Sequence, residues 1–216
     1  MTASNQHQPT DAENKFNAMM RDLGDLVNTS AEGLYAILGE GNDWAFIVKM
    51  CALVETAVSQ LITNVSDEPH LAPLMQVLAE DFLGKKVNYV AAMALLSDQS
   101  ISTARGLARI RNQLVHSIEN LDFSLAKHLA ASPDNLDIFI QGFGRLQKPQ
   151  SQVEYDAVRE IVKTDARLLM KYAVVALLRE VYQAKSKVLA RASFKRVDRA
   201  FANLMIDNLR PPDRAE

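Results

Sequence analysis

Four polar residues follow one another at helical spacing between positions 101 and 118, and their types suit acid–base or anion chemistry. They are Arg105, Arg109, Asn112 and His116, separated by four, three and four positions. On an α-helix this spacing places them on one face. An imidazole exchanges protons near neutral pH, and a guanidinium stabilises charge that develops on a phosphate. The stripe therefore predicts a binding surface, or metal-independent cleavage of RNA through its own 2′-hydroxyl.

The same stripe has a purely structural interpretation. A histidine close to the C-terminal end of a helix is favoured by the helix dipole. His116 lies near the end of the helix expected over 101–118, where such a cation belongs. On spacing alone, both interpretations stay open.

Arg111 lies on the other face of this helix, among apolar side chains. Ala104, Leu107 and Leu114 fall in the same arc of a helical wheel. A lone charge in an apolar arc needs a partner, because burying it unpaired costs several kcal/mol. Glu55 is the one carboxylate on the strongly apolar helix expected over 44–65. We therefore predict a Glu55–Arg111 ion pair between the two helices.

The segment around Arg111 resembles the mannitol operon repressor (MtlR-like) family. The resemblance is carried by RIRNQLVHS (109–117) with Asp122-Phe123, preceded by ALVE (52–55) and DFLGKKVNYVAAMALL (81–96). It covers about 44–125, and the chain departs from the family pattern at Val115 and in LGKKVNY. The resemblance implies an all-α regulatory protein that acts on transcription through a protein partner, without a recognisable DNA-binding motif.

The string Arg-Asn-x-x-x-His also resembles the HEPN superfamily of all-α, usually dimeric proteins, many of which are metal-independent ribonucleases. That resemblance implies Arg111, Asn112 and His116 as active-site residues. On an ideal helix Arg111 points about 140° away from His116. The ribonuclease interpretation therefore requires a distorted helix or a site shared between two subunits.

Composition limits the class of protein. The chain has 216 residues, a formal net charge of -2, 8 glycines, 7 prolines and one cysteine. Such a chain can bury a core as one domain, and the scarcity of turn-forming residues argues against a many-stranded β fold. One cysteine excludes an intrachain disulfide, and Cys51 lies in an apolar stripe typical of a buried, inert thiol. We expect neither a secretory signal nor a membrane-spanning segment, and a cytoplasmic location.

The hydrophobic periodicity predicts an all-α, single-domain helical bundle of seven or eight helices. The expected helices cover 11–38, 44–65, 71–82, 86–97, 101–118, 123–131, 153–190 and 194–208, with a loop between 131 and 153. The expected divisions are a disordered tail over 1–11, the helical domain over 12–190, and a basic C-terminal helix and tail over 191–216. The helices over 44–65, 101–118 and 153–190 should form the core.

The C-terminal segment 185–216 is basic, with eight Lys or Arg residues against four Asp or Glu residues. Lys195, Arg196 and Arg199 make it a candidate surface for nucleic acid or an acidic partner. Phe194 and Phe201 lie seven positions apart and would dock on the core or on a second subunit. A solvated helix face is the simpler explanation of the charges.

Two functions follow, a regulator of the mannitol operon repressor type and a HEPN-like ribonuclease with RNA as substrate. For the regulator we expect no catalytic residue and another regulatory protein as partner. Both functions are compatible with a homodimer. His70 and His128 lie apart from other metal-binding residues, so we expect no metal and no cofactor.

Overall fold

The chain folds into a bundle of α-helices. The structure, a computed structural model, describes residues 11–66, 69–115, 123–144 and 151–209. These residues form nine α-helices and one short 3-10 helix, with no strand among them. The elements are α1 (Asp11–Leu26), α2 (Ala31–Leu38), α3 (Asp43–Thr63), η1 (Pro69–Leu71), α4 (Ala72–Glu80), α5 (Leu83–Ala92), α6 (Asp98–Val115), α7 (Leu125–Ala130), α8 (Pro133–Phe143) and α9 (Gln152–Leu209). The all-α prediction is confirmed, with one helix more than the seven or eight expected.

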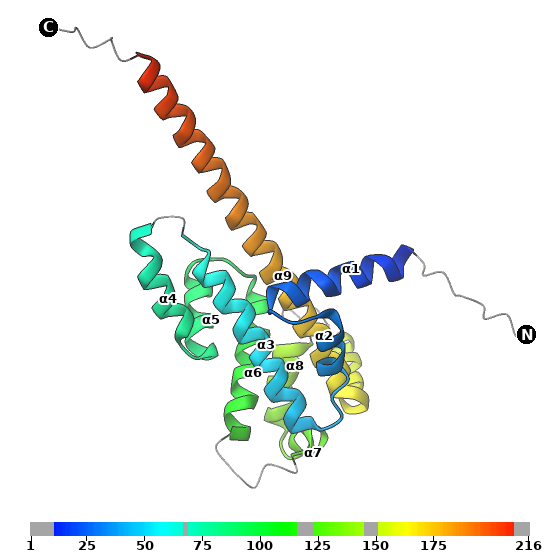
Figure 1. The fold of residues 1–216 in the computed structure, drawn as a ribbon. Helices are drawn as coiled ribbons and strands as arrows, with labels where there is room; N and C mark the ends of the chain where they lie inside the picture. The colour runs from blue at the N-terminus through cyan, green and yellow to red at the C-terminus, as the bar shows by residue number, and fades with distance from the viewer. Residues whose placement is uncertain (1–10, 67–68, 116–122, 145–150, 210–216) are drawn as a thin grey trace, which may run out of the picture.

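Helix α3 lies at the centre of the bundle (Figure 1), where α4, α5, α6 and α9 pack against it. It begins where the Asn42 side chain accepts a hydrogen bond from the Ala45 amide at 2.9 Å. Its apolar residues, from Phe46 to Ile62, are buried on more than one face. The expected core of α3, α6 and α9 is confirmed, because each of the three contacts the other two.

Helix α3 is also the one helix in the described part of the chain that is long and apolar enough to cross a membrane. Its place inside the bundle accounts for that composition, since a helix covered by neighbours on several sides is apolar all round. The same feature is therefore consistent with the core helix of a soluble protein.

The single helix expected over 11–38 is wrong, because the chain breaks between α1 and α2. Asn28 adopts a left-handed backbone with φ of 54°, and the Ser30 hydroxyl accepts from the Gly33 amide at 3.1 Å to begin α2. The turn brings Thr29 onto Gly24, where an added Cβ would lie 2.6 Å from the Thr29 carbonyl oxygen. Only glycine allows this close approach.

The loop expected after residue 131 is also wrong, because α8 occupies 133–143. Pro133 is in the first turn of this helix, and the Ser132 hydroxyl caps it by accepting from the Asp134 amide at 3.2 Å. Proline is favoured at this position because its missing N–H would be unpaired anyway. What the sequence suggested as a break is therefore a helix start.

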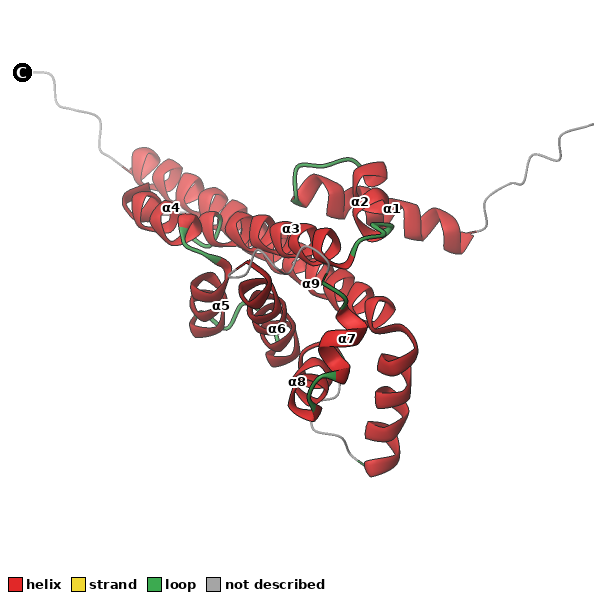
Figure 2. Ribbon diagram, turned by 90° about the horizontal axis from the view of Figure 1, so that it is seen from below, coloured by secondary structure: helices red, strands yellow, loops and turns green. Residues whose placement is uncertain are grey.

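The break expected between 190 and 194 is absent, since α9 runs on to Leu209. Its kink is at Asp165, where φ is -153° and ψ is 79°. The Asp165 carboxylate accepts from the Leu168 amide at 2.9 Å and so caps the second segment. Figure 2 shows the first segment turned away from the second.

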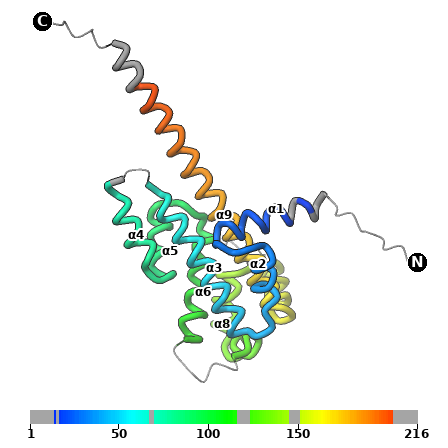
Figure 3. Tube along the Cα trace, viewed as in Figure 1, coloured from blue at the N-terminus to red at the C-terminus, as the bar shows by residue number. Residues whose placement is uncertain are grey.

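The second segment of α9 leaves the bundle as a projecting rod (Figure 3). Val181 is its last buried residue among those with described side chains, and Lys185 contacts α3 through Gln60 at 3.2 Å. We call residues 186–209 the arm. The basic helix predicted at the C-terminus is thus continuous with a core helix, while residues 210–216 lie outside the described part of the chain.

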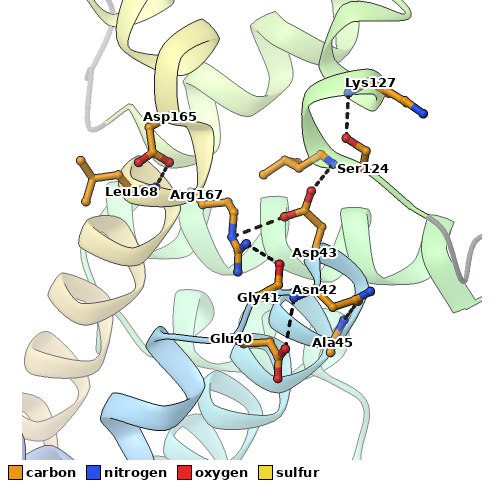
Figure 4. Close-up of polar contacts among 11 residues, drawn as sticks. Glu40, Gly41, Asn42, Asp43, Ala45, Ser124, Lys127, Asp165, Arg167 and Leu168 are labelled. Carbon is orange, nitrogen blue, oxygen red and sulfur yellow. Dashed lines mark hydrogen bonds and ion pairs between the residues drawn. The ribbon is translucent and has the colours of Figure 1, made fainter.

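Arg167, just after the kink, connects α9 to the start of α3 (Figure 4). Its Nη1 donates to the Gly41 carbonyl at 2.8 Å, and its Nε lies 3.4 Å from Oδ1 of Asp43. The other oxygen of Asp43 accepts from the Leu125 amide at 2.8 Å, at the first residue of α7. One carboxylate thus holds the starts of α3 and α7 together with α9.

Candidate functional site: the arginine face of α6

Helix α6 carries the candidate site, and its N-terminal end is anchored by α9. Glu180 accepts hydrogen bonds from the Ser97 amide at 2.5 Å and from the Ser97 hydroxyl at 2.8 Å. The Ser100 hydroxyl also donates to this carboxylate. A carboxylate at a helix N-terminus is stabilised by the helix dipole, so Glu180 fixes the position of α6 in the bundle.

One face of α6 packs closely on α8 at two glycines. A Cβ added at Gly106 would lie 3.5 Å from the Gly142 Cα and 3.3 Å from the Phe143 ring. The Thr103 hydroxyl donates to the Gly142 carbonyl at 2.7 Å across this contact. Beside this contact, α6 has an exposed face toward α5, formed by Arg105, Arg109, Asn112 and Gln113.

The predicted polar stripe lies on that open face. Arg105, Arg109 and Asn112 line a shallow surface groove of about 490 Å³ beside Gly84 of α5. Arg105 donates from Nη2 to Oδ1 of Asn88 on α5 at 3.1 Å. Within the described part of the chain, neither arginine makes an ion pair. The three residues thus share one face, which we call the arginine face, and the positive charge of its two arginines is available to an anion. His116, the fourth residue of the stripe, lies outside the described residues.

A small cavity of about 10 Å³ lies behind Arg109 and is also lined by His128. Burial lowers the pKa of His128, so its imidazole stays neutral over a wider pH range. The ring lies 5.5 Å from that of Phe123. In the sequence His128 is isolated from other candidate residues, and only the fold places it next to Arg109.

Arg111 does not form the ion pair with Glu55 that the sequence predicted. Glu55 instead pairs with Lys86 of α5, whose Nζ lies 3.2 Å from Oε1. Arg111 is half-buried, and its Nη1 donates to Oδ1 of the adjacent Asn112 at 3.3 Å. It does not line the groove that contains Arg105 and Arg109.

Lys86, the ion-pair partner of Glu55, was not among the residues predicted from the sequence. It is 4 % exposed and lies in the buried stripe Leu83, Lys86, Val87 and Val90 of α5. A lysine at an i, i+3 position of an apolar stripe signals a buried cation that needs a carboxylate. The helix predicted for this region covered 86–97 and left out Leu83 and the first turn of α5. Without Leu83, the apolar stripe that includes Lys86 could not be recognised.

Cys51 of α3 lies near this group of charges. Burial is the main reason why the pKa of Cys51 is raised to about 11, and the negative charge of Glu55 adds to the effect. The positive charges of Arg111 and Lys86 oppose it. Arg111 therefore lies within electrostatic range of the same thiol as Glu55 and Lys86. The thiol stays protonated at neutral pH, as expected for an inert, buried cysteine.

The described residues contain no group of three or more His, Cys, Asp or Glu side chains placed to hold a metal ion. The groups that this face offers are guanidiniums and amides, which donate hydrogen bonds to anions.

In comparisons with known proteins, no family model, curated protein or solved structure matched the chain.

Proposed function

We propose that the chain is a cytoplasmic regulatory protein of the mannitol operon repressor type, which acts through a protein partner and not by catalysis. The observation that carries the proposal is the arm of α9. Phe194, Val197 and Phe201 are all more than 60 % exposed on it. Exposed apolar residues at i, i+3 and i+7 on one helix are typical of a helix that docks on another protein.

The charges of the arm favour an acidic partner. Lys187, Arg191, Lys195, Arg196 and Arg199 surround the apolar residues, with Asp198 as the one acidic residue between 187 and 202. Complementary charge speeds encounter and selects partners. An acidic groove on another regulatory protein is the surface that this arm fits.

The position of Arg111 supports a regulatory role over catalysis. Arg111 is half-buried near Cys51, Glu55 and Lys86, and does not line the open groove. A half-buried guanidinium that is hydrogen-bonded to its own helix and lies outside the groove is poorly placed for catalysis, because a catalytic guanidinium must reach the reacting phosphate.

Transcript levels in cells test the proposal. A strain lacking the gene is complemented with the wild type, with the double variant Phe194→Asp/Phe201→Asp, or with Leu168→Asp/Tyr172→Asp. Leu168 and Tyr172 are also exposed on α9 but precede the arm. We expect the wild type and the control variant to restore the transcripts of a defined operon, and the arm variant to fail.

Two results would contradict the regulatory role. One is a set of transcripts that does not respond to deletion of the gene. The other is full complementation by the arm variant, provided that circular dichroism shows that all three proteins are folded.

A homodimer stays a prediction. The apolar residues on α9 that a second copy would cover are Leu189, Phe194 and Phe201, each at least 45 % exposed. Sedimentation equilibrium of the wild type beside Phe194→Asp/Phe201→Asp tests it, with a dimer expected only for the wild type. A wild type that stays monomeric at high concentration argues against it.

The second candidate function is a HEPN-like, metal-independent ribonuclease. The observation that favours it is the groove of Arg105, Arg109 and Asn112, whose arginines make no ion pair in the described part of the chain. Unpaired arginines on a groove wall bind phosphate groups.

Incubation with RNA in EDTA tests this candidate. The wild type is compared with His116→Ala and with Arg109→Gln, which removes one groove cation. Cleavage by the wild type that is lost in His116→Ala supports a ribonuclease. RNA left intact by the wild type argues against it.

A further inference from the structure

A concave groove lies at the junction of α7, α8 and the first segment of α9, and it shares no lining residue with the groove on α6. Its volume is about 390 Å³. Apolar side chains form most of its walls, among them Leu129, Leu136 and Val162, while Arg159 and Lys163 of α9 supply the charge. Pockets for small molecules in proteins have this size and this mixture of an apolar lining with few polar groups.

Arg159 is the polar group without a hydrogen-bond partner in this groove. Its Nε atom is buried and has no acceptor among the described residues. Arg159 makes no ion pair with them either. A buried N–H without an acceptor is unfavourable because it has lost its hydrogen bonds to water. Because Nε is closed to water in this structure, a ligand in the groove supplies that acceptor only when the guanidinium turns toward it.

Lys163 does not take the same role. Its Nζ lies 2.6 Å from Oε1 of Glu160, so its charge is already balanced on the surface of α9. Arg159 is therefore the cation of the groove that is free to bind an anionic group.

We propose that this groove binds a small amphipathic carboxylate. The carboxylate accepts hydrogen bonds from Arg159, since planar guanidinium and carboxylate groups match in geometry. The apolar chain of the ligand lies against Leu129 and Leu136 and is removed from water. Among the residues that the structure describes, none that lines the groove has an aromatic side chain on which a nucleobase would stack. This assigns a ligand site that is independent of the proposed regulatory function.

Isothermal titration with octanoate and with octanol tests the proposal on the full chain. The two probes share an eight-carbon chain and differ in the carboxylate. We expect octanoate to bind about tenfold more tightly than octanol, because the charge-assisted hydrogen bond to Arg159 is made only by octanoate.

Variants locate the binding site. Arg159→Gln should lower octanoate affinity to that of octanol, whereas Lys163→Gln should change it less than threefold, roughly, because that charge is already paired. Ala130→Phe places a ring in the groove and should abolish binding of both probes. Arg179→Gln, at an exposed arginine of α9 outside both grooves, is the matched control and should bind octanoate like the wild type.

Equal affinities for octanoate and octanol would overturn the proposal, as would unchanged octanoate binding in Arg159→Gln or in a folded Ala130→Phe variant. Absence of octanoate binding to the wild type would overturn it too. Co-sedimentation with vesicles that contain anionic phospholipid separates a free ligand from a lipid headgroup. The proposal expects no co-sedimentation that depends on Arg159, and vesicle binding lost in Arg159→Gln contradicts it.

Discussion

The ammonium group of Lys86 lies 3.2 Å from the Glu55 carboxylate and joins α5 to α3. The two side chains differ in burial, since that of Lys86 is 5 % exposed and that of Glu55 is 35 % exposed. The lysine therefore depends on the pair more than the carboxylate does. Loss of the carboxylate would leave a buried cation without a counter-charge.

The first prediction concerns this pair. Glu55→Gln should lower the free energy of unfolding by about 1–3 kcal/mol, which is below the cost for a fully buried pair because Glu55 is partly solvated. Lys86→Met should cost less, since methionine fits an apolar stripe. Urea unfolding followed by circular dichroism measures both effects.

The double variant is the control for this interpretation. With the charge of Lys86 removed, Glu55→Gln should cost less than about 0.5 kcal/mol. Additive losses in Glu55→Gln/Lys86→Met would show that the two groups do not stabilise each other.

The sequence predicted those parts of the fold that depend on local signals. The apolar stripe of α3, with Cys51 inside it, has the expected period and is buried. The break at Asp165 was missed because neither glycine nor proline marks it, and its signal is a single capping carboxylate. Aspartate also occurs inside unbroken helices, so Asp165 alone does not predict a kink. Packing against the neighbouring helices decides whether the helix breaks there.

The candidate site was predicted in part for the same reason. Spacing alone placed Arg105, Arg109 and Asn112 on one face, because that geometry belongs to a single helix. The partner of Glu55 depends on how α3, α5 and α6 are arranged in space. The prediction considered charged residues on only two of these helices, α3 and α6, and therefore overlooked Lys86 on α5. The neighbourhood of His128 and Arg109 depends on packing in the same way.

The second prediction follows from Cys51. Burial raises the pKa of its thiol from the ordinary value of 9.0 to about 11, so the folded protein keeps the proton that the unfolded chain loses above pH 9. The stability due to this group is fully present below pH 9 and is lost as the pH rises toward 11. The loss is at most about 1.4 kcal/mol per pH unit.

Comparison with Cys51→Ala isolates this effect from other groups that titrate in alkali. The free energy of unfolding should fall more between pH 8 and pH 10, roughly, for the wild type than for the variant. Equal slopes would contradict the raised pKa. As an independent check, a thiol reagent at pH 8, approximately, should label the folded wild type only as fast as the protein unfolds.

The third prediction concerns Asp43, whose two oxygens contact Arg167 and the Leu125 amide. Asp43→Ala removes both interactions and should lower the free energy of unfolding by about 2–3 kcal/mol. Asp43→Asn keeps an acceptor for Leu125 and should cost about 1 kcal/mol. Urea unfolding gives these values, and hydrogen exchange at Leu125 should accelerate most in Asp43→Ala.

Asp156 serves as the control for Asp43, because it is exposed and is bound only by Gln152 among the described contacts, at 3.0 Å. Asp156→Ala should change stability by less than about 0.5 kcal/mol. A similar loss in Asp43→Ala and Asp156→Ala would mean that the connection between α3, α7 and α9 contributes nothing.

The fourth prediction tests the contact of α6 with α8. A Cβ at Gly106 would lie 3.3 Å from the Phe143 ring. Because Phe143 is fully buried, its ring has no room to move away from a larger side chain at position 106. Gly106→Val should destabilise the protein by about 2–3 kcal/mol through overpacking. It should also weaken anion binding to the groove, because a shift of α6 moves Arg105 and Arg109 together.

Gly41→Ala is the matched control, since nothing lies within 4 Å of a Cβ at that position. A Gly106→Val variant as stable as Gly41→Ala would show that α6 and α8 are packed less closely than the structure indicates.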